Sequence, residues 1–184
     1  MIPTTSLIRL RSRFGAALMT LFISAGIASA VTWKSSDYNC QVSLPESEPM
    51  TASKGWSPIG STEEGTLVGA RRIDGSAFVF LGYVDIAKRP KFHLNDKTIE
   101  ELEKRFFGPG LGFRRSKERV SLRGMPGYRL TGDSVYHGSH FGLVVDMYEA
   151  NGLIYQLAGM KEDDLHPLND FDIKWYMGSF RLLR

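Results

Sequence analysis

Two histidines, His137 and His140, flank the dipeptide Gly138-Ser139, a pair that suits a two-residue hairpin turn. Side chains that face each other across such a turn have β-carbons about 5 Å apart, so two imidazoles could share one zinc or copper ion. A stable site would need a third ligand from elsewhere in the chain. The alternative is an exposed, polar hairpin tip. We favour this alternative and predict no tight metal site and no cofactor.

The chain has a single cysteine, Cys40, which cannot form an intramolecular disulfide. Apolar residues recur at every second position around it (Tyr38, Cys40, Val42 and Leu44), which is typical of a strand with one buried face. The sequence contains no Gly-x-Ser-x-Gly elbow, no His-Glu-x-x-His pair and no Walker phosphate loop. We therefore predict a protein that is not an enzyme. The alternative is a small hydrolase, or a redox or metal-dependent enzyme, that uses Cys40 or the two histidines.

Three basic residues, Arg115, Lys117 and Arg119, alternate along residues 113–122 and would share one face of a strand. Residues 88–123 hold 11 basic and 5 acidic residues, a net charge of +6, while 31–87 and 124–184 each carry −3. A patch of one sign favours an acidic protein, a lipid headgroup surface or an anionic envelope polymer as partner. The alternative is an edge strand whose basic side chains prevent pairing with other chains. We predict that these three residues bind the partner.

The first 30 residues have the order of a secretory signal peptide: Arg9, Arg11 and Arg13, an apolar run over 16–27, and Ala-Ser-Ala at 28–30. We predict that residues 1–30 are cleaved and that residues 31–184 form one domain in the periplasm or outside the cell. Without residues 1–30, the chain has 20 basic and 20 acidic residues. The sequence therefore gives no reason to expect nucleic-acid binding. We expect a monomer.

Residues 66–73 and 76–86 have the patterns of two strands joined at Asp74-Gly75, a strong hairpin signal. A helix is predicted from Thr98, because a glutamate follows three positions later as in a capping box. Ile99, Leu102 and Phe106 would form its apolar face.

A second helix is predicted near the end of the chain, capped by Asn169 or Asp170. Phe171 and Trp175, four positions apart, are expected to pack in the core.

Residues 128–160 predict three antiparallel strands with two-residue turns at 138–139 and 151–152. The first turn would pair His137 with His140, and the second would place Tyr148 opposite Tyr155. One face would then carry Tyr128, Leu130, Tyr136, Phe141, Leu143, Val145 and Met147, and the other Val144, Tyr148, Tyr155 and Leu157. Because both faces are apolar, we expect the sheet to be covered on both sides.

The chain resembles the PsbP/DcrB-like superfamily in five short segments: "VSLP" at 42–45, "TIEELEKRF" at 98–106, "GMPGYRLTG" at 124–132, "GLIYQLAG" at 152–159 and "MGSFRLL" at 177–183. The resemblance implies an α+β fold with an antiparallel β-sheet flanked by helices on both faces, a PsbP-like α/β/α sandwich. It also implies a small exported binding or accessory protein that is not an enzyme. One branch of the superfamily is a subunit of photosystem II and another binds the GTPase Ran, but none of their partner or metal residues matches a position here. The expected function is docking of an acidic partner or an anionic envelope component through the basic strand face.

Overall fold

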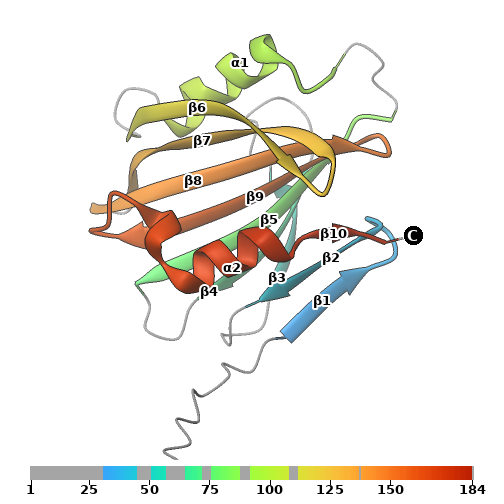
Figure 1. Ribbon diagram of the computed structural model, residues 1–184, viewed down its shortest axis with the longest axis horizontal. Coiled ribbons are helices and arrows are strands. Elements are labelled where there is room, and N and C mark those ends of the chain that lie inside the picture. Colours follow the sequence, from blue (N-terminus) through green and yellow to red (C-terminus); the bar gives the residue numbers. More distant parts are fainter. Residues whose placement is uncertain are drawn as a thin grey trace, which may run out of the picture.

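Ten strands and two α-helices make up the described part of the chain in the computed structural model (Figure 1). The structure describes residues 31–44, 51–56, 65–71, 76–87, 92–107, 112–136 and 138–183. The strands are β1 (Val31–Ser35), β2 (Cys40–Leu44), β3 (Thr51–Trp56), β4 (Gly65–Arg71), β5 (Ala77–Asp85), β6 (Gly112–Leu122), β7 (Met125–Tyr136), β8 (Ser139–Ala150), β9 (Leu153–Glu162) and β10 (Arg181–Leu182). The helices are α1 (Asp96–Phe106) and α2 (Phe171–Ser179), and the 3-10 turn η1 (Pro167–Asn169) precedes α2.

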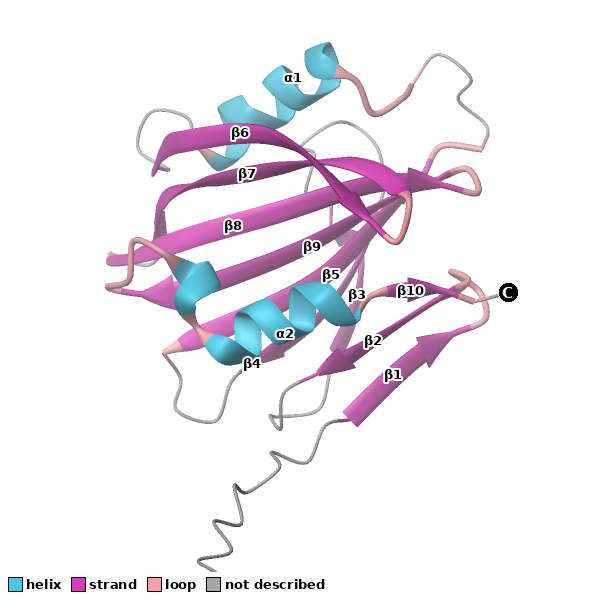
Figure 2. Ribbon diagram, in the orientation of Figure 1, coloured by secondary structure: helices cyan, strands magenta, loops and turns pink. Residues whose placement is uncertain are grey.

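The strands form two antiparallel sheets (Figure 2). The larger sheet has seven strands in the order β3-β4-β5-β9-β8-β7-β6, and the smaller sheet has the order β1-β2-β10. The predicted hairpin is observed, since β4 pairs with β5, while Asp74-Gly75 lies outside the described residues. The described residues thus form a mostly β protein with two antiparallel sheets and few helices.

The turns of the β7-β8-β9 meander set its register. Asn151 and Gly152 have φ values of 53° and 75°, as a type I′ turn requires, and Tyr148 lies opposite Tyr155 as predicted. The β7–β8 pairing differs from the prediction, because Val135 and not His137 lies opposite His140. This shift of two residues leaves every side chain on its expected face, since side chains alternate with a period of two.

Both faces of the large sheet are apolar, as the sequence predicts. One buried cluster contains Val144, Tyr148, Tyr155 and Leu157 together with Cys40 of β2 and Ile173 of α2. The other contains Tyr128, Leu130, Leu143, Val145 and Met147 together with Ile99 of α1. Figure 1 shows α1 beside β6 and β7, and α2 beside β5 and β9.

The N-cap of α1 lies three residues before the predicted position. Its N-cap is Asn95, whose side-chain oxygen accepts a hydrogen bond from the Thr98 backbone N–H at 3.1 Å. Thr98 is therefore inside the first turn, where its hydroxyl donates to the His93 carbonyl oxygen at 2.7 Å. The predicted capping box at Thr98 was wrong because Asn95, an equally good cap residue, already satisfies the orphan N–H.

The cap of the second helix is confirmed, but its predicted core face was wrong. The Asp170 carboxylate accepts hydrogen bonds from the backbone N–H groups of Asp172 and Ile173 at 3.0 and 3.2 Å. Phe171, expected in the core, is 77% exposed. The buried face instead consists of Ile173, Tyr176 and Met177, which recur at helical spacing on the side that faces the sheet.

Candidate anion-binding groove

A β-bulge at Arg115 divides the basic residues of β6 between two faces. Arg114 lies opposite Gly132 and Ser116 opposite Thr131, so Arg115 is the extra residue of the strand. Arg115 donates to the Asp133 carboxylate at 2.9 and 3.1 Å, and to the Leu165 carbonyl oxygen at 3.2 Å. Our expectation that Arg115 shares a face with the next two basic residues was therefore wrong.

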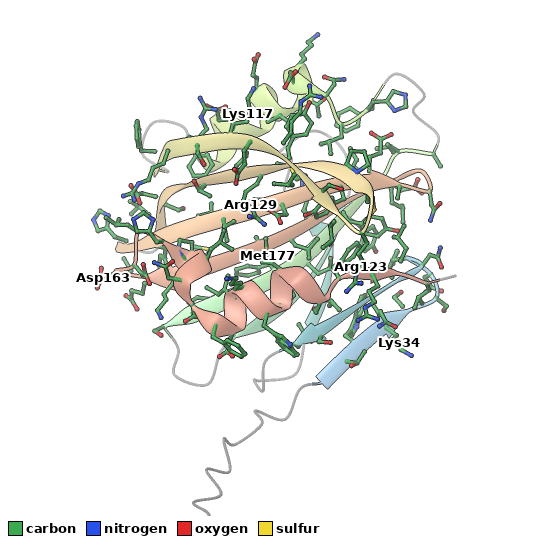
Figure 3. The ribbon with its side chains drawn as sticks, in the orientation of Figure 1. Lys34, Lys117, Arg123, Arg129, Asp163 and Met177 are labelled. Atoms are coloured by element: carbon green, nitrogen blue, oxygen red, sulfur yellow. The ribbon has the colours of Figure 1, made fainter. Side chains whose placement is uncertain are left out.

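Lys117 and Arg119 lie on the face of β6 that borders α1 (Figure 3). Both approach the Asp96 carboxylate at the start of α1, at 3.7 and 3.2 Å. Arg114, which strict alternation along the strand would place on the opposite face, shares this side and pairs with Glu103 of α1 at 2.8 Å. Each positive charge of β6 thus has an acidic neighbour, which lowers the field that a partner would meet. Partner binding by Arg115, Lys117 and Arg119 stays a prediction.

A second set of basic residues comes together around the small sheet. Lys34, Gln41 and Arg181 lie side by side across β1, β2 and β10. Arg123, in the turn between β6 and β7, and Lys34 lie at the same end of the molecule (Figure 3). Arg123, Lys174 and Arg181 line one shallow hollow of about 510 Å³, which we call the basic hollow. The rest of its lining consists of Thr32, Gln41, Ser43, Trp175, Gly178 and Ser179.

Among the described residues, the lining of the basic hollow contains no carboxylate. Within the described ranges, Arg123, Lys174 and Arg181 make no ion pair, in contrast to the basic residues of β6. Arginine and lysine side chains without acidic partners are the groups that proteins use to bind carboxylates and phosphates. The hollow can therefore bind an anion without first breaking an internal salt bridge.

Local structure holds these three cations in place. Arg123 and Gly124 have φ values of 53° and 83°, so Arg123 sits in a tight turn of the same type as Asn151-Gly152. The Ser179 hydroxyl accepts a hydrogen bond from the Ser43 N–H at 2.9 Å and fixes the end of α2 to β2. The helix that carries Lys174 and the strand that carries Arg181 are thus both attached to β2.

A second hollow of about 610 Å³ adjoins the basic hollow and has Arg129 in its lining, so we call it the Arg129 hollow. Figure 3 labels Arg129 and Met177, two of its lining residues. Arg129 donates to the Asp146 carboxylate through Nε at 2.6 Å and Nη2 at 2.7 Å. Asp146 is 1% exposed and also accepts a hydrogen bond from the Tyr148 hydroxyl at 3.0 Å. Its hydrogen bonds raise the pKa of Arg129, and burial, with the Asp146 charge, raises the pKa of Tyr148. Arg129 therefore keeps its positive charge at neutral pH.

The surroundings of Cys40 disfavour the reactive thiolate form. Its side chain is fully buried on β2, as the sequence predicts, and burial raises the pKa of the thiol from 9.0 to about 12. The thiol is the form present at neutral pH, and the thiolate is the reactive form.

We expect Cys40 to resist iodoacetamide in the folded protein at pH 8. A pKa raised by three units lowers the thiolate fraction about a thousandfold, before burial slows access further. Alkylation followed by mass spectrometry, with and without denaturant, measures the difference. The raised pKa also means that Cys40 stabilises the fold fully below about pH 9 and that this contribution is lost as the pH rises towards 12. Rapid alkylation without denaturant would contradict the prediction.

The described residues contain no group of three or more His, Cys, Asp or Glu side chains that could hold a metal ion. His140 is exposed, and His137 lies outside the described residues, so the predicted histidine pair is not tested beyond its register. Searching the same residues, we find no helix whose length and apolarity would let it cross a membrane.

No pattern in the sequence predicts the basic hollow. Arg123, Lys174 and Arg181 are single cations in three separate segments, and each has acidic or apolar neighbours along the chain. Only Arg123 falls within the strongly basic segment 88–123. The recognisable local feature is the Arg123-Gly124 turn, which places a basic residue at a rigid tip.

No family model matches the chain, and no curated protein matches it in a sequence comparison. The solved structure of the cyanobacterial PsbP protein CyanoP from Synechocystis sp. PCC 6803 is similar over 86% of this chain and 95% of that chain. The TM-score is 0.60 at 12% sequence identity. The chain has a PsbP-like fold. The resemblance seen in the sequence is thereby confirmed for the fold. A sequence identity of 12% supports no statement about function.

Two other structures are more distantly similar to this PsbP-like chain. PA94 from Pseudomonas aeruginosa, a protein of unknown function and putative regulator, has a TM-score of 0.44 at 12% identity, over 81% of this chain and 94% of that chain. LpqN, involved in cell envelope biogenesis of Mycobacterium tuberculosis, has a TM-score of 0.44 at 13% identity, over 88% of both chains. TM-scores this low carry no argument about function.

Proposed function

We propose that this protein is an exported accessory protein that binds an anionic partner and catalyses no reaction of its own. The signal-like order of residues 1–30 supports export, and the protonated, buried state of Cys40 argues against a thiol enzyme. The PsbP-like fold supports the proposal only as a scaffold, because a fold alone does not carry function. We also propose the full α/β/α sandwich, since Ile99 of α1 and Ile173 of α2 belong to different buried clusters.

The observation that carries the proposal is the basic hollow, where three cations meet and the lining, as far as the structure describes it, has no carboxylate. The alternative surface for binding the partner consists of Arg115, Lys117 and Arg119 on β6, which the sequence predicts. On this surface the Arg119 side chain is 76% exposed and so accessible to a partner. We favour the basic hollow because Arg115, Lys117 and Arg119 already lie beside Asp133 or Asp96. A charge that is already paired gains less from a new partner than a free one.

Two matched variants test which surface binds anions. One carries Arg123→Gln, Lys174→Gln and Arg181→Gln, and the other carries the same change at Arg115, Lys117 and Arg119. Both remove three positive charges, so the net charge of the two variants is equal. We expect the first to weaken binding of fluorescent poly-L-glutamate at least about tenfold, or about 1.4 kcal/mol, and to flatten its salt dependence. We expect the second to change the affinity much less.

The outcomes of this comparison are distinct. A larger loss in the β6 variant would move the partner surface to Arg115, Lys117 and Arg119, as the sequence predicts. Equal losses would show that poly-L-glutamate responds to net charge and that neither surface is a site. Unfolding curves of both variants serve as the control, because exposed substitutions usually change stability within about 0.5 kcal/mol.

Export makes a separate prediction. We expect the protein purified from its native source to begin at Val31, because Ala-Ser-Ala at 28–30 has the pattern of a signal-peptidase site. N-terminal sequencing or intact-mass spectrometry decides this. A mature chain that starts at Met1 would refute the prediction.

A further inference from the structure

The basic hollow and the Arg129 hollow meet at α2. Lys174 and Gly178, one helical turn apart, line both of them. Both hollows are open to solvent rather than enclosed. A ligand that fills one hollow can therefore extend into the other by passing over Gly178.

Gly178 has no conformational or packing reason to be glycine. Its backbone is helical, and a β-carbon added at this position would meet no atom within 4 Å. Glycine inside a helix costs roughly 0.5–1 kcal/mol relative to alanine. Because Gly178 has no side chain, the passage between the two hollows stays open.

The two hollows offer different chemistry. The lining of the Arg129 hollow includes the apolar side chains of Val120, Leu122, Leu168 and Met177. The basic hollow offers three cations and the polar side chains of Gln41 and Ser43. A ligand that matches both must carry an apolar group beside negative charges.

Arg129 adds a fixed donor to the Arg129 hollow. Its Nε and Nη2 atoms hold Asp146, whereas Nη1 has only Glu118 near it, at 4.0 Å, which is beyond hydrogen-bond distance. The buried Asp146 therefore fixes the guanidinium plane and leaves Nη1 able to donate to a ligand. The rotamer entropy of the arginine is already lost before any ligand binds.

We propose that the two hollows form one groove that binds an extended acidic peptide segment of a partner protein. An apolar side chain of the peptide occupies the Arg129 hollow, and its carboxylates meet Arg123, Lys174 and Arg181. This inference rests on the proposed function and adds the class of ligand. A lipid tail would need an enclosed cavity to bury its surface, and an acidic polysaccharide has no bulky apolar side group for the Arg129 hollow.

Gly178→Trp tests the groove at its junction, with Gly178→Ala as the matched control. Because a β-carbon at this position contacts nothing, we expect both variants to fold with the wild-type circular dichroism spectrum. Their melting temperatures should equal or exceed that of the wild type, because each replaces a glycine inside a helix. A displayed library of random dodecapeptides is selected on wild-type protein and on each variant. We expect the wild type and Gly178→Ala to enrich peptides that combine Asp or Glu with a nearby large apolar residue. The dissociation constant of an enriched peptide should rise at least about tenfold on Gly178→Trp, and its recovery from the library should fall.

Equal recovery on Gly178→Trp and wild type, or enrichment of peptides without acidic residues, would overturn the inference. Phosphatidylglycerol vesicles and alginate are tested on the same three proteins. If either binds in a Gly178→Trp-sensitive way while no peptide is enriched, the occupant is a lipid surface or a polysaccharide and the peptide proposal is wrong. If poly-L-glutamate binding still depends on Arg123, Lys174 and Arg181 while no peptide is enriched, this inference fails and the proposed function stands.

Discussion

Replacing Arg129 by alanine is expected to lower the free energy of unfolding by about 3–5 kcal/mol, the usual cost of removing one partner from a buried ion pair. Asp146 is 1% exposed, and Arg129 supplies two of its hydrogen bonds, at 2.6 and 2.7 Å. Without Arg129 the carboxylate keeps the Tyr148 hydroxyl at 3.0 Å, which cannot compensate a buried negative charge. Urea denaturation followed by circular dichroism measures the change.

The double variant Arg129→Gln with Asp146→Asn is the control. Removing both charges together leaves neutral amides that can still hydrogen bond to each other and to Tyr148. We expect this variant to recover most of the stability, because no unpaired charge stays buried. If Arg129→Ala alone costs less than about 1 kcal/mol, the pair behaves like an exposed salt bridge and our account of its burial is wrong.

Replacing Asp170 by alanine is expected to cost about 2–3 kcal/mol of stability, through two separate losses. The first is the N-cap of α2, since Asp170 accepts from the N–H groups of Asp172 and Ile173, and such a cap contributes about 1 kcal/mol. The second is the ion pair with Lys161 at 2.7 Å, in which the Asp170 side chain is 4% exposed. Lys161 is 27% exposed and can regain water, so we expect this loss to be smaller than at Asp146.

Asp170→Asn separates the two losses. Asparagine keeps an oxygen that can cap the helix and removes the charge that pairs with Lys161. Thermal or urea unfolding should place this variant between the wild type and Asp170→Ala, about 1 kcal/mol above the latter. Equal stability of the two variants would show that the cap contributes nothing here.

Local sequence determined much of the fold. The alternation around Cys40 predicted a buried strand, and Cys40 is fully buried on β2. The Asn151-Gly152 pair predicted the turn that places Tyr148 opposite Tyr155, because few residue pairs accept the positive φ values that this turn requires. The apolar pattern predicted which residues of β8 and β9 lie on each face, since a strand exposes its side chains alternately.

Tertiary packing decided the positions where local signals were equal. Asn95 and Thr98 are both good cap residues, and the helix begins at Asn95, where the Thr98 hydroxyl can also reach the His93 carbonyl oxygen. Phe171 has the right spacing for the core, but Ile173, Tyr176 and Met177 take that place because α2 turns them towards the sheet. The sequence shows the helical spacing of the apolar residues. It does not show which apolar face of the helix is buried against the sheet.

The candidate site depended on tertiary structure most of all. Alternation predicted one basic face on β6. The bulge at Arg115 adds one residue that has no opposite residue on β7, and this reverses the alternation. Arg115 therefore points away from Lys117 and Arg119 and contacts Asp133. The sequence therefore determined that this region is basic, and the fold decided which charges are paired. Arg123, Lys174 and Arg181 meet because β10 returns to pair with β2 beside α2, a long-range contact that no local pattern records.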